Sequence, residues 1–428
     1  MPLQYRAPRG TADILPEEQP YWKHILGTAE RLCQLFGYQA IETPIFEEAS
    51  LFTRGVGETT DIVQKEMYAF RDRGGDELAL RPEGTAGVCR AYLQNGMHNL
   101  PQPVRLYYSG PIFRYDRPQA GRYRQHTQFG VEAIGEADAT VDAEIIELLW
   151  RLYEELNFSN LTLQLNSIGD ANCRPVYLRV LRDYYGERLS QVCDECHGRF
   201  ERNPLRLLDC KEERCQPIIA AAPPITDHLC QECADHFSRL RQYLEDIYIP
   251  YILNPCLVRG LDYYTRTVFE VTPPEEGAQG TIGGGGRYDG LIQELGGKPT
   301  PGIGFATGIE RIVLNLKRQK VPVPEPSPLV IFIAYQTAAA RFLAFQLASA
   351  LRRADISALV AAGDRSLKAQ MRQADALGAR YAAIIGEREL PQGTVVLRRL
   401  ADGWQDTVQL GAVARHVQDP APGFRPVP

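Results

Sequence analysis

The segment IFRYDRPQAGRYRQHTQFGVEAI (112–134) holds the chain's strongest candidates for chemistry. Its second half predicts a strand on which Gln128, Gly130 and Glu132 share one face, because side chains alternate along a strand. Gly130 opens space on that face, and Arg114 lies on the strand before it. A carboxylate, an amide and a guanidinium together suit the binding of an amino acid and a phosphate. A solvent-exposed polar face is the competing interpretation.

A second group of candidates lies in LVRGLDYYTRTVFE (257–270), which is closely followed by GTIGGGGRYDGL. Arg259 stands between apolar residues, so it needs either a buried partner or a ligand. The four consecutive glycines at 283–286 have no side chain to pack and favour close approach of the backbone to a ligand. Tyr263 and Tyr264 belong either to the same site or to the aromatic core.

A third element, RPEGTAG (81–87), puts Glu83 and Thr85 beside a predicted helix start. The pair is either part of a binding site or a plain N-terminal cap. The chain contains no GxxxxGK[ST] phosphate loop, and the glycines of GIGFATGIER (302–311) lack the GxGxxG spacing. A protein of this sequence that uses ATP must therefore hold the triphosphate by other means.

The elements that position these residues change character along the chain. After a predicted helix at about 17–36, strand-like runs dominate and indicate an antiparallel sheet with helices packed on it, an α+β arrangement. The stretch from about 175 to 245 is predicted to be a helical insertion into that sheet. The strand-like runs are residues 104–116, 125–135 and 266–272.

The proline-alternating stretch QKVPVPEPSP (319–328) predicts a stiff linker. Beyond it, strands and helices alternate, which indicates a small, mainly parallel sheet covered by helices. We therefore expect one domain over 1–325, an α/β domain over 329–428, and a disordered tail over about 418–428. The predicted strands of the second domain are 329–335, 356–360 and 380–385, and its helices are 338–353 and 366–377.

Composition and charge narrow the function classes. A chain of 428 residues that is 44% hydrophobic and 23% charged is ordinary globular protein. With no apolar run long enough for a membrane span and no visible secretory signal, we expect a cytoplasmic protein without membrane association. The net charge of −6 argues against non-specific nucleic-acid binding, yet the part from Leu329 onward has 12 basic and 8 acidic residues, a net of +4.

The ten cysteines are unevenly spread, and six lie at positions 193, 196, 210, 215, 230 and 233. Two CxxC pairs, Cys193/Cys196 and Cys230/Cys233, are typical of a tetrahedral zinc site. The gap between the pairs is longer than the usual ~15–20 residues, and two more cysteines lie inside it. Reduced cysteines that pack a small core are therefore the favoured interpretation, and structural zinc is the alternative.

These motifs together resemble the class II aminoacyl-tRNA synthetases, and specifically the histidyl-tRNA synthetase family of the bacterial type. FRYDRPQAGRYRQ (113–125) resembles the arginine strand and loop of motif 2, GIGFATGIER resembles motif 3, and YQAIETPIFE (38–47) resembles motif 1. LVRGLDYYTRTVFE with GGGGRYDGL resembles the two histidine-specific motifs, and RGTADILPEE (9–18) resembles the family's start. The part from Leu329 to Leu410 resembles the class IIa anticodon-binding domain.

The resemblance implies ligation of L-histidine to tRNA(His) through a histidyl-adenylate, with ATP and accompanying Mg²⁺. It implies catalytic roles for Arg114 and Arg259 at the α-phosphate, while Arg122 and Arg311 bind ATP. Arg117 and Gln119 would contact the tRNA acceptor end. The implied histidine-binding set is Glu83, Gly84, Thr85, Arg114, Gln128, Glu132, Arg259, Tyr263 and Tyr264.

The resemblance also implies a homodimer, paired through the early helix and the motif 1 region, and it brings no required metal to the cysteine-rich insertion. The main rival is a catalytically inactive paralogue that regulates another process by binding histidine or tRNA. Such paralogues typically lose the arginines of the motifs and the anticodon-binding domain. Arg114, Arg259, Arg311 and residues 329–428 are all present here, which disfavours that rival.

Overall fold

The computed structural model describes residues 5–57, 60–117, 121–274, 280–325 and 327–418. Gln119 and residues 419–428 of the predicted tail lie outside these described residues, while Gln418 is the last residue of a helix. The chain forms two compact units, of which the first ends at Pro324 and the second begins at Glu325.

An eight-stranded sheet forms the centre of the first unit. The six inner strands are antiparallel to one another. The two edge strands, β1 and β8, each pair in parallel with the strand beside them. This confirms the antiparallel sheet expected for an α+β class II fold. The strand order is β1 (Gln39–Ala40), β5 (Val104–Phe113), β6 (Gln125–Ile134), β11 (Gly302–Gly308), β10 (Gly283–Arg287), β9 (Thr265–Thr272), β7 (Thr162–Ser167), β8 (Ile252–Leu253).

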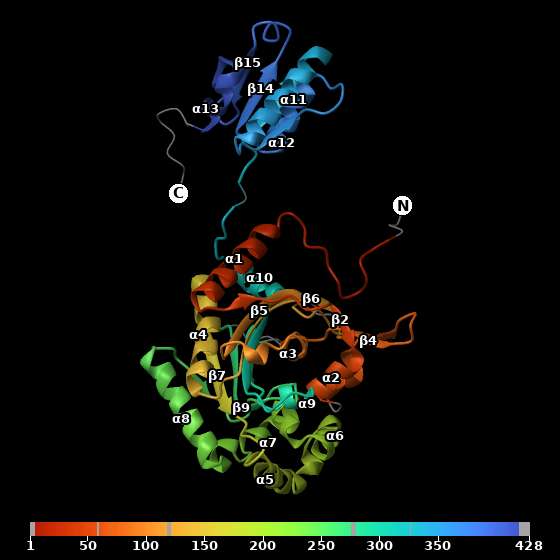
Figure 1. Cartoon of the computed structure of the whole chain (residues 1–428), viewed down its shortest axis with the longest axis vertical. Helices are drawn as coiled ribbons and strands as arrows, with labels where there is room; N and C mark the ends of the chain where they lie inside the picture. Colours follow the sequence, from red (N-terminus) through yellow and green to blue (C-terminus); the bar gives the residue numbers. More distant parts are fainter. Residues whose placement is uncertain (1–4, 58–59, 118–120, 275–279, 326, 419–428) are drawn as a thin grey trace. The chain divides into compact units, whose positions relative to one another are not determined.

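One face of this sheet is covered by four long helices. Apolar side chains of the helices and of alternate strand residues such as Phe129, Val131 and Phe305 form a single buried core. Helices α4 and α8 run side by side along this face (Figure 1). The four helices are α1 (Gln19–Leu35), α4 (Ala139–Glu155), α8 (Gln231–Asp246) and α10 (Ile309–Arg318).

The opposite face carries Gly130 and Glu132 of β6, as the alternation along the strand predicts. Helix α3 (Thr85–Gln94) and the cysteine-rich insertion contribute side chains to the core on this side. The remaining elements here are α2 (Ala49–Val56), η1 (Ile62–Glu66), η2 (Met97–Asn99), α9 (Leu291–Glu294) and the small antiparallel sheet β2 (Phe46–Glu48), β4 (Glu77–Leu80), β3 (Ala69–Arg71).

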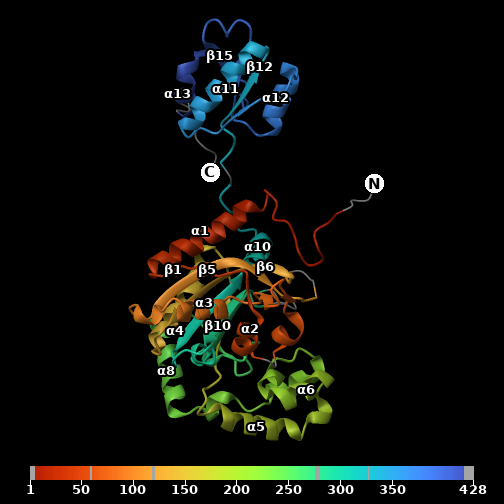
Figure 2. The ribbon, with the colours of Figure 1, turned by 45° about the vertical axis from the view of Figure 1, so that its right-hand side comes forward.

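The insertion is helical, as expected, and it consists mostly of short elements. Helices α5 and α6 lie at the end of the first unit away from α1 and α10 (Figures 1 and 2). Its elements up to α8 are α5 (Arg174–Gly186), η3 (Leu189–Gln191), α6 (Asp194–Arg202), η4 (Pro204–Asp209), η5 (Glu213–Cys215), α7 (Gln216–Ala220) and η6 (Ile225–His228).

The structure divides the expected set Cys193, Cys196, Cys230 and Cys233 between two places. The first CxxC pair lies with Cys210 and Cys215, whereas the second lies with Cys173 and Asp170. The chain between the pairs folds into several short helices, so the sequence order of the cysteines does not predict which of them meet.

A buried ion cluster joins the last helix of the insertion to the sheet. Asp142 on α4 accepts a hydrogen bond from Arg287 Nε on β10 (2.7 Å) and lies 2.8 Å from His236 Nε2 on α8. Burial alone would raise the pKa of Asp142, but Arg287 and His236 outweigh it and hold the pKa below its usual value. The buried Asp142 carboxylate therefore links α4 to β10 and to α8.

The second unit contains a five-stranded sheet in the order β13, β12, β14, β15, β16. The first three are parallel as predicted, and β15 (Thr394–Arg399) and β16 (Gln405–Gln409) add an antiparallel hairpin that the sequence analysis did not include. The other elements are β12 (Ile331–Tyr335), β13 (Ala358–Val360), β14 (Tyr381–Ile385), α11 (Ala338–Arg353), α12 (Leu367–Ala376), η7 (Leu410–Ala412) and α13 (Val413–Gln418).

The helices of the second unit begin at residues that cap them. The Thr337 hydroxyl accepts from the backbone N–H of Ala340, and the Ser366 hydroxyl accepts from that of Ala369. Among the described residues of both units, no helix is long and apolar enough to cross a membrane.

Candidate active site

Glu132 lies at the centre of a buried polar cluster on the second face of the main sheet. Thr85 Oγ1 donates to its Oε1 (2.7 Å), and the Tyr288 hydroxyl donates to its Oε2 (2.6 Å). A side chain at Gly304 on the neighbouring strand would collide with Glu132 Oε2. The carboxylate is therefore held from two sides, and the glycine beneath it provides the room.

Burial raises the pKa of Glu132 to about 8, even though Tyr288 and Thr85 donate hydrogen bonds that favour the charged form. Aromatic side chains enclose the carboxylate: the ring of Tyr263 lies 4.7 Å from that of Tyr264 and 5.9 Å from that of Tyr288. A ligand that donates a hydrogen bond to this carboxyl group would stabilise its charged form, which burial disfavours.

Glu83 caps the N-terminus of α3, as the simpler interpretation of RPEGTAG predicts. Its two carboxylate oxygens accept from the backbone N–H groups of Thr85 (2.7 Å) and Ala86 (2.8 Å), and the Tyr263 hydroxyl lies 3.4 Å from Oε2. Burial raises the pKa of Glu83, and these backbone bonds oppose the rise. A carboxylate has lone pairs beyond the two used here, so the cap leaves capacity for a ligand.

Arg259 reaches the site from the loop before β9, where it has a half-buried acidic partner. It pairs with Glu270 on β9, and its guanidinium lies 5.7 Å from the centre of the Tyr264 ring. Burial alone would lower the pKa of Arg259, but Glu270 and Tyr264 outweigh burial and raise it, so the arginine stays charged. Its Nε is buried without a hydrogen-bond partner, which leaves one donor available to a ligand.

Three more arginines converge at the other end of the site. Arg114 Nε donates to the Pro82 carbonyl (2.7 Å), and Arg122 pairs with Asp116 (2.8 Å). Arg311 donates to the carbonyls of Gly121 (3.0 Å) and Thr281 (2.6 Å). Burial lowers the pKa of Arg311, and the positive charges of Arg122 and Arg114 lower it further. This mutual repulsion is relieved when a polyanion binds among the three guanidinium groups.

Of two further predicted site residues, Gly84 is buried and Gln128 is half-buried. Gln128 Oε1 on β6 is buried without a hydrogen-bond partner, so a donor on a ligand would satisfy it. A side chain at Gly84 would collide with the ring of Tyr108, and Gly84 is therefore required for packing.

The glycine run 283–286 leaves room for neighbouring strands and side chains. Its residues are all buried in β10 between two other strands. A Cβ at Gly284 would lie 3.1 Å from Arg259 Nη1, and one at Gly286 would lie 2.9 Å from the Tyr264 ring. The space that these glycines leave on the site face is thus taken by two site residues, whereas we had expected a ligand against the backbone.

The structure brings together five predicted site residues: Glu83, Thr85, Glu132, Tyr263 and Tyr264. Arg259 lies beside Tyr264, and the other three arginines lie near one another. Arg117 lies on the exposed loop that follows Arg114, and its backbone N–H donates to Asp116 Oδ1 (2.7 Å).

The sequence analysis missed two partners of the site residues, Tyr288 and Glu270. Both stand inside the motifs already singled out, GGGGRYDGL and LVRGLDYYTRTVFE. Their positions in those motifs were the available signal, but the contacts with Glu132 and Arg259 depend on strand pairing that the motifs do not reveal.

Comparison with known proteins agrees with this geometry. Residues 10–312 match the profile of the family described as histidyl-tRNA synthetase, and residues 329–419 match that of an anticodon binding domain. The histidine–tRNA ligase of Dehalococcoides mccartyi (strain ATCC BAA-2266 / KCTC 15142 / 195) is 58% identical over 407 residues, which cover 95% of this chain and 97% of the relative. The chain belongs to the histidyl-tRNA synthetase family.

Other relatives agree with this assignment. The histidine–tRNA ligase of Pelotomaculum thermopropionicum is 51% identical over 97% of this chain and 98% of the relative. The crystal structure of apo histidyl-tRNA synthetase from Staphylococcus aureus matches with a TM-score of 0.82 and 37% identity, and the match covers 97% of this chain and 100% of that one.

Another solved structure shares the fold at much lower identity. A structure described as an ATP phosphoribosyltransferase regulatory subunit/histidyl-tRNA synthetase from Bacillus halodurans C has a TM-score of 0.63 and 22% identity, covering 90% of this chain and 98% of that one. At that identity the likeness shows the fold alone. The ligase relatives, at 51–58% identity, are far more similar to this chain.

Proposed function

We propose that this synthetase ligates L-histidine to tRNA(His) in two steps, with ATP as the energy source and AMP and diphosphate as products. The observation that carries the proposal is the buried Glu132 carboxylate, held by Thr85 and Tyr288 beside Tyr263 and Tyr264. A neutral imidazole offers one donor and one acceptor on opposite sides of its ring, and this cluster supplies both kinds of partner.

In the histidine pocket, the Glu132 carboxylate accepts from one imidazole nitrogen and the Tyr264 hydroxyl serves the other. Glu83, Gln128 and Thr85 surround the α-ammonium group, and the unpaired Gln128 Oε1 supports this assignment. An amino acid without the imidazole would leave buried polar groups unpaired, so it would be rejected.

In the first step, the histidine carboxylate attacks the α-phosphorus of ATP, the bond to the β-phosphate breaks, and diphosphate leaves. Negative charge spreads over the phosphate oxygens in the transition state. Arg114 and Arg259 stabilise that charge, and the available Nε of Arg259 fits this role. Arg311 and Arg122 hold the rest of the nucleotide.

Mg²⁺ accompanies ATP in this proposal. Asp116 and Glu270 already pair with Arg122 and Arg259, so these carboxylates are poorly suited to hold the ion by themselves. The phosphates of ATP would supply its main ligands.

In the second step, the adenylate transfers histidine to the acceptor end of tRNA(His). We assign acceptor contacts to Arg117 and Gln119 on the motif 2 loop, and anticodon binding to the domain over 329–428. The net positive charge of that domain supports RNA binding. We further propose a cytoplasmic homodimer, as in the family that the sequence resembles.

A regulatory paralogue would bind histidine without activating it. Arg114, Arg259 and Arg311 all lie in the site and surround it with positive charge, which a histidine sensor does not need. These arginines favour the enzyme over the sensor.

The test is ATP–diphosphate exchange with each of the twenty amino acids offered separately. We expect exchange with histidine alone, followed by charging of tRNA(His). Exchange with another amino acid would refute the pocket assignment, and histidine binding without exchange would favour the regulatory paralogue.

A further inference from the structure

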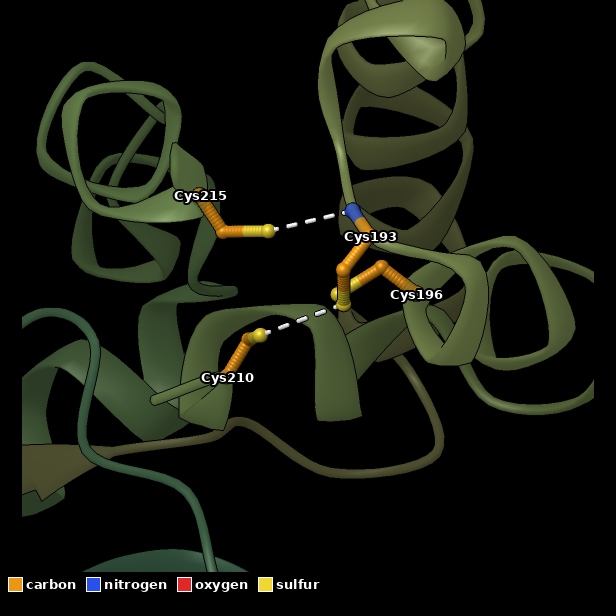
Figure 3. A group of neighbouring side chains, drawn as sticks. All are labelled: Cys193, Cys196, Cys210 and Cys215. Atoms are coloured by element: carbon orange, nitrogen blue, oxygen red, sulfur yellow. Dashed lines mark hydrogen bonds between the residues drawn. The ribbon is translucent and has the colours of Figure 1, made fainter. Parts of the chain in front are cut away.

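Four cysteines from one stretch of the insertion, residues 193–215, converge in the structure. Cys193 precedes α6, Cys196 lies in its first turn, Cys210 follows η4, and Cys215 ends η5. All four are buried, and their sulfur atoms lie within 4.8 Å of one another. Figure 3 shows Cys193 and Cys196 at the start of one helix, with Cys210 and Cys215 pointing toward them from other segments.

The spacing of the sulfur atoms fits one tetrahedral ion. With Zn–S bonds of about 2.3 Å, the edges of a ZnS₄ tetrahedron are about 3.8 Å long. Cys193 Sγ lies 3.6 Å from Cys210 Sγ, which is far longer than the ~2.05 Å of a disulfide. The cysteines are free thiols in this structure.

Two features of the backbone suit thiolate ligands at Cys193 and Cys215. Cys193 is the residue that caps α6, and thiolates are stabilised at helix N-termini. The backbone N–H of Cys193 donates to Cys215 Sγ (3.3 Å), the kind of outer hydrogen bond that metal-bound thiolates accept. The chain between Cys196 and Cys215 contains only the rest of α6 and two short 3₁₀ helices, so it has little regular structure to hold the cluster together.

We propose that Cys193, Cys196, Cys210 and Cys215 bind one zinc ion as four thiolates. Each thiol gives up its proton to solvent when the metal binds. Four sulfur ligands in tetrahedral geometry suit zinc or iron, and a closed four-ligand shell is typical of structural zinc. This assignment keeps the first CxxC pair of the sequence analysis and replaces Cys230 and Cys233 by Cys210 and Cys215.

The second cysteine group is a weaker candidate. It consists of Asp170, Cys173, Cys230 and Cys233. Asp170 already pairs with Arg266 (3.2 Å), and Cys230 is only half-buried. A metal there would compete with that ion pair for one of its four ligands, so we assign the zinc to the four-cysteine group.

The zinc would also stabilise the active-site loop that carries Arg259. Asn203 lies between α6 and η4, inside the segment that the metal closes, and its Nδ2 donates to Asp262 Oδ1 (2.8 Å). A Cβ at Gly260 would lie 3.4 Å from Arg206 Nη1 of η4. Gly260 and Asp262 follow Arg259 in the loop that carries it, so the closed segment supports that loop.

The primary test is the metal content of the full-length protein, purified without a metal-affinity tag or added zinc and dialysed against metal-free buffer. Elemental analysis should find a zinc ion in the wild type that both Cys210→Ala and Cys215→Ala lack. Cys33→Ala removes a buried thiol of α1 and should retain it. Cys233→Ala tests the second group and should also retain it.

Two further measurements on the wild type do not depend on folding of the variants. Replacement of the metal by Co²⁺ should produce the intense absorption of tetrahedral cobalt thiolate, and a mercurial reagent should release zinc to a coloured chelator. A wild type without metal, a coloured iron protein, or zinc lost in Cys233→Ala but not in Cys210→Ala would each overturn the proposal. None of these readouts depends on synthetase activity.

Discussion

Tyr288→Phe tests whether histidine selection depends on how Glu132 is held. The change removes one hydroxyl, which donates to Glu132 Oε2 at 2.6 Å inside the core, and leaves the ring in place. A hydrogen bond to a charged group contributes about 1.5–3 kcal/mol. If the bond is needed to present the carboxylate to the imidazole, kcat/KM for histidine should fall about 10- to 150-fold, since each 1.4 kcal/mol is a factor of ten.

The assay is histidine-dependent ATP–diphosphate exchange between pH 6.5 and 9.5. The Tyr288 hydroxyl favours the charged form of Glu132, and burial raises the pKa of that carboxyl to about 8. Without the hydroxyl this pKa rises further, so the increase of kcat/KM with pH should move to higher pH in the variant.

Tyr153→Phe is the matched control. The Tyr153 hydroxyl is also buried and donates to Thr307 Oγ1 (2.9 Å), but it comes from α4 on the other face of the sheet. Tyr153→Phe should lose about 1 kcal/mol of the free energy of unfolding and Tyr288→Phe about 1.5–3 kcal/mol, because only the second bond has a carboxylate acceptor. Only Tyr288→Phe should affect histidine activation. Equal kcat/KM values and equal pH profiles in the two variants would refute the reasoning.

Three other predictions follow from the same contacts. Glu132→Ala should lower histidine activation at least ~100-fold in the exchange assay, because a charged hydrogen bond contributes up to ~3 kcal/mol; kinetics near wild type would end that assignment. Because its pKa of about 8 in the folded protein lies above the ordinary value of 4.5, Glu132 destabilises the protein as pH rises from about 5 to 8. Wild type should therefore lose free energy of unfolding relative to Glu132→Gln over that range, measured by urea denaturation at each pH. Asp142→Asn should cost about 3–5 kcal/mol of stability in the same measurement, because it removes the fully buried carboxylate partner of Arg287 and leaves only the less buried Asp289 (3.1 Å).

Much of the fold was predictable because it depends on local pattern. The alternation of apolar and polar residues over 125–135 predicted both the strand β6 and the face on which Glu132 lies, since the pleat of a strand has a period of two. The helix at 338–353 was likewise predicted with the bounds that the structure has. The hairpin of β15 and β16 was not, because the edge strand β16 is mostly polar and exposed and its periodic signal is weak.

The site was predictable as a set of residues but not as a set of contacts. Motif resemblance identified Glu132 and Arg259, whose side chains do meet the predicted neighbours. It did not identify Tyr288 or Glu270 as their partners, because those contacts depend on which strands lie beside β10. Likewise, the CxxC spacing offered Cys193, Cys196, Cys230 and Cys233 only as an alternative metal set, and the structure divides the two pairs between a four-cysteine group and a group of three cysteines with Asp170.

The sequence by itself thus determined the order of the elements, the polar face of β6 and the arginines that the site needs. These follow from backbone periodicity and residue chemistry, which act over a few residues. Only the tertiary structure decided which buried groups pair, as Tyr288 does with Glu132 across 156 positions of the chain. Such a pair forms because the sheet sets strands side by side in an order unrelated to their order in sequence, and burial then makes every unpaired polar group costly.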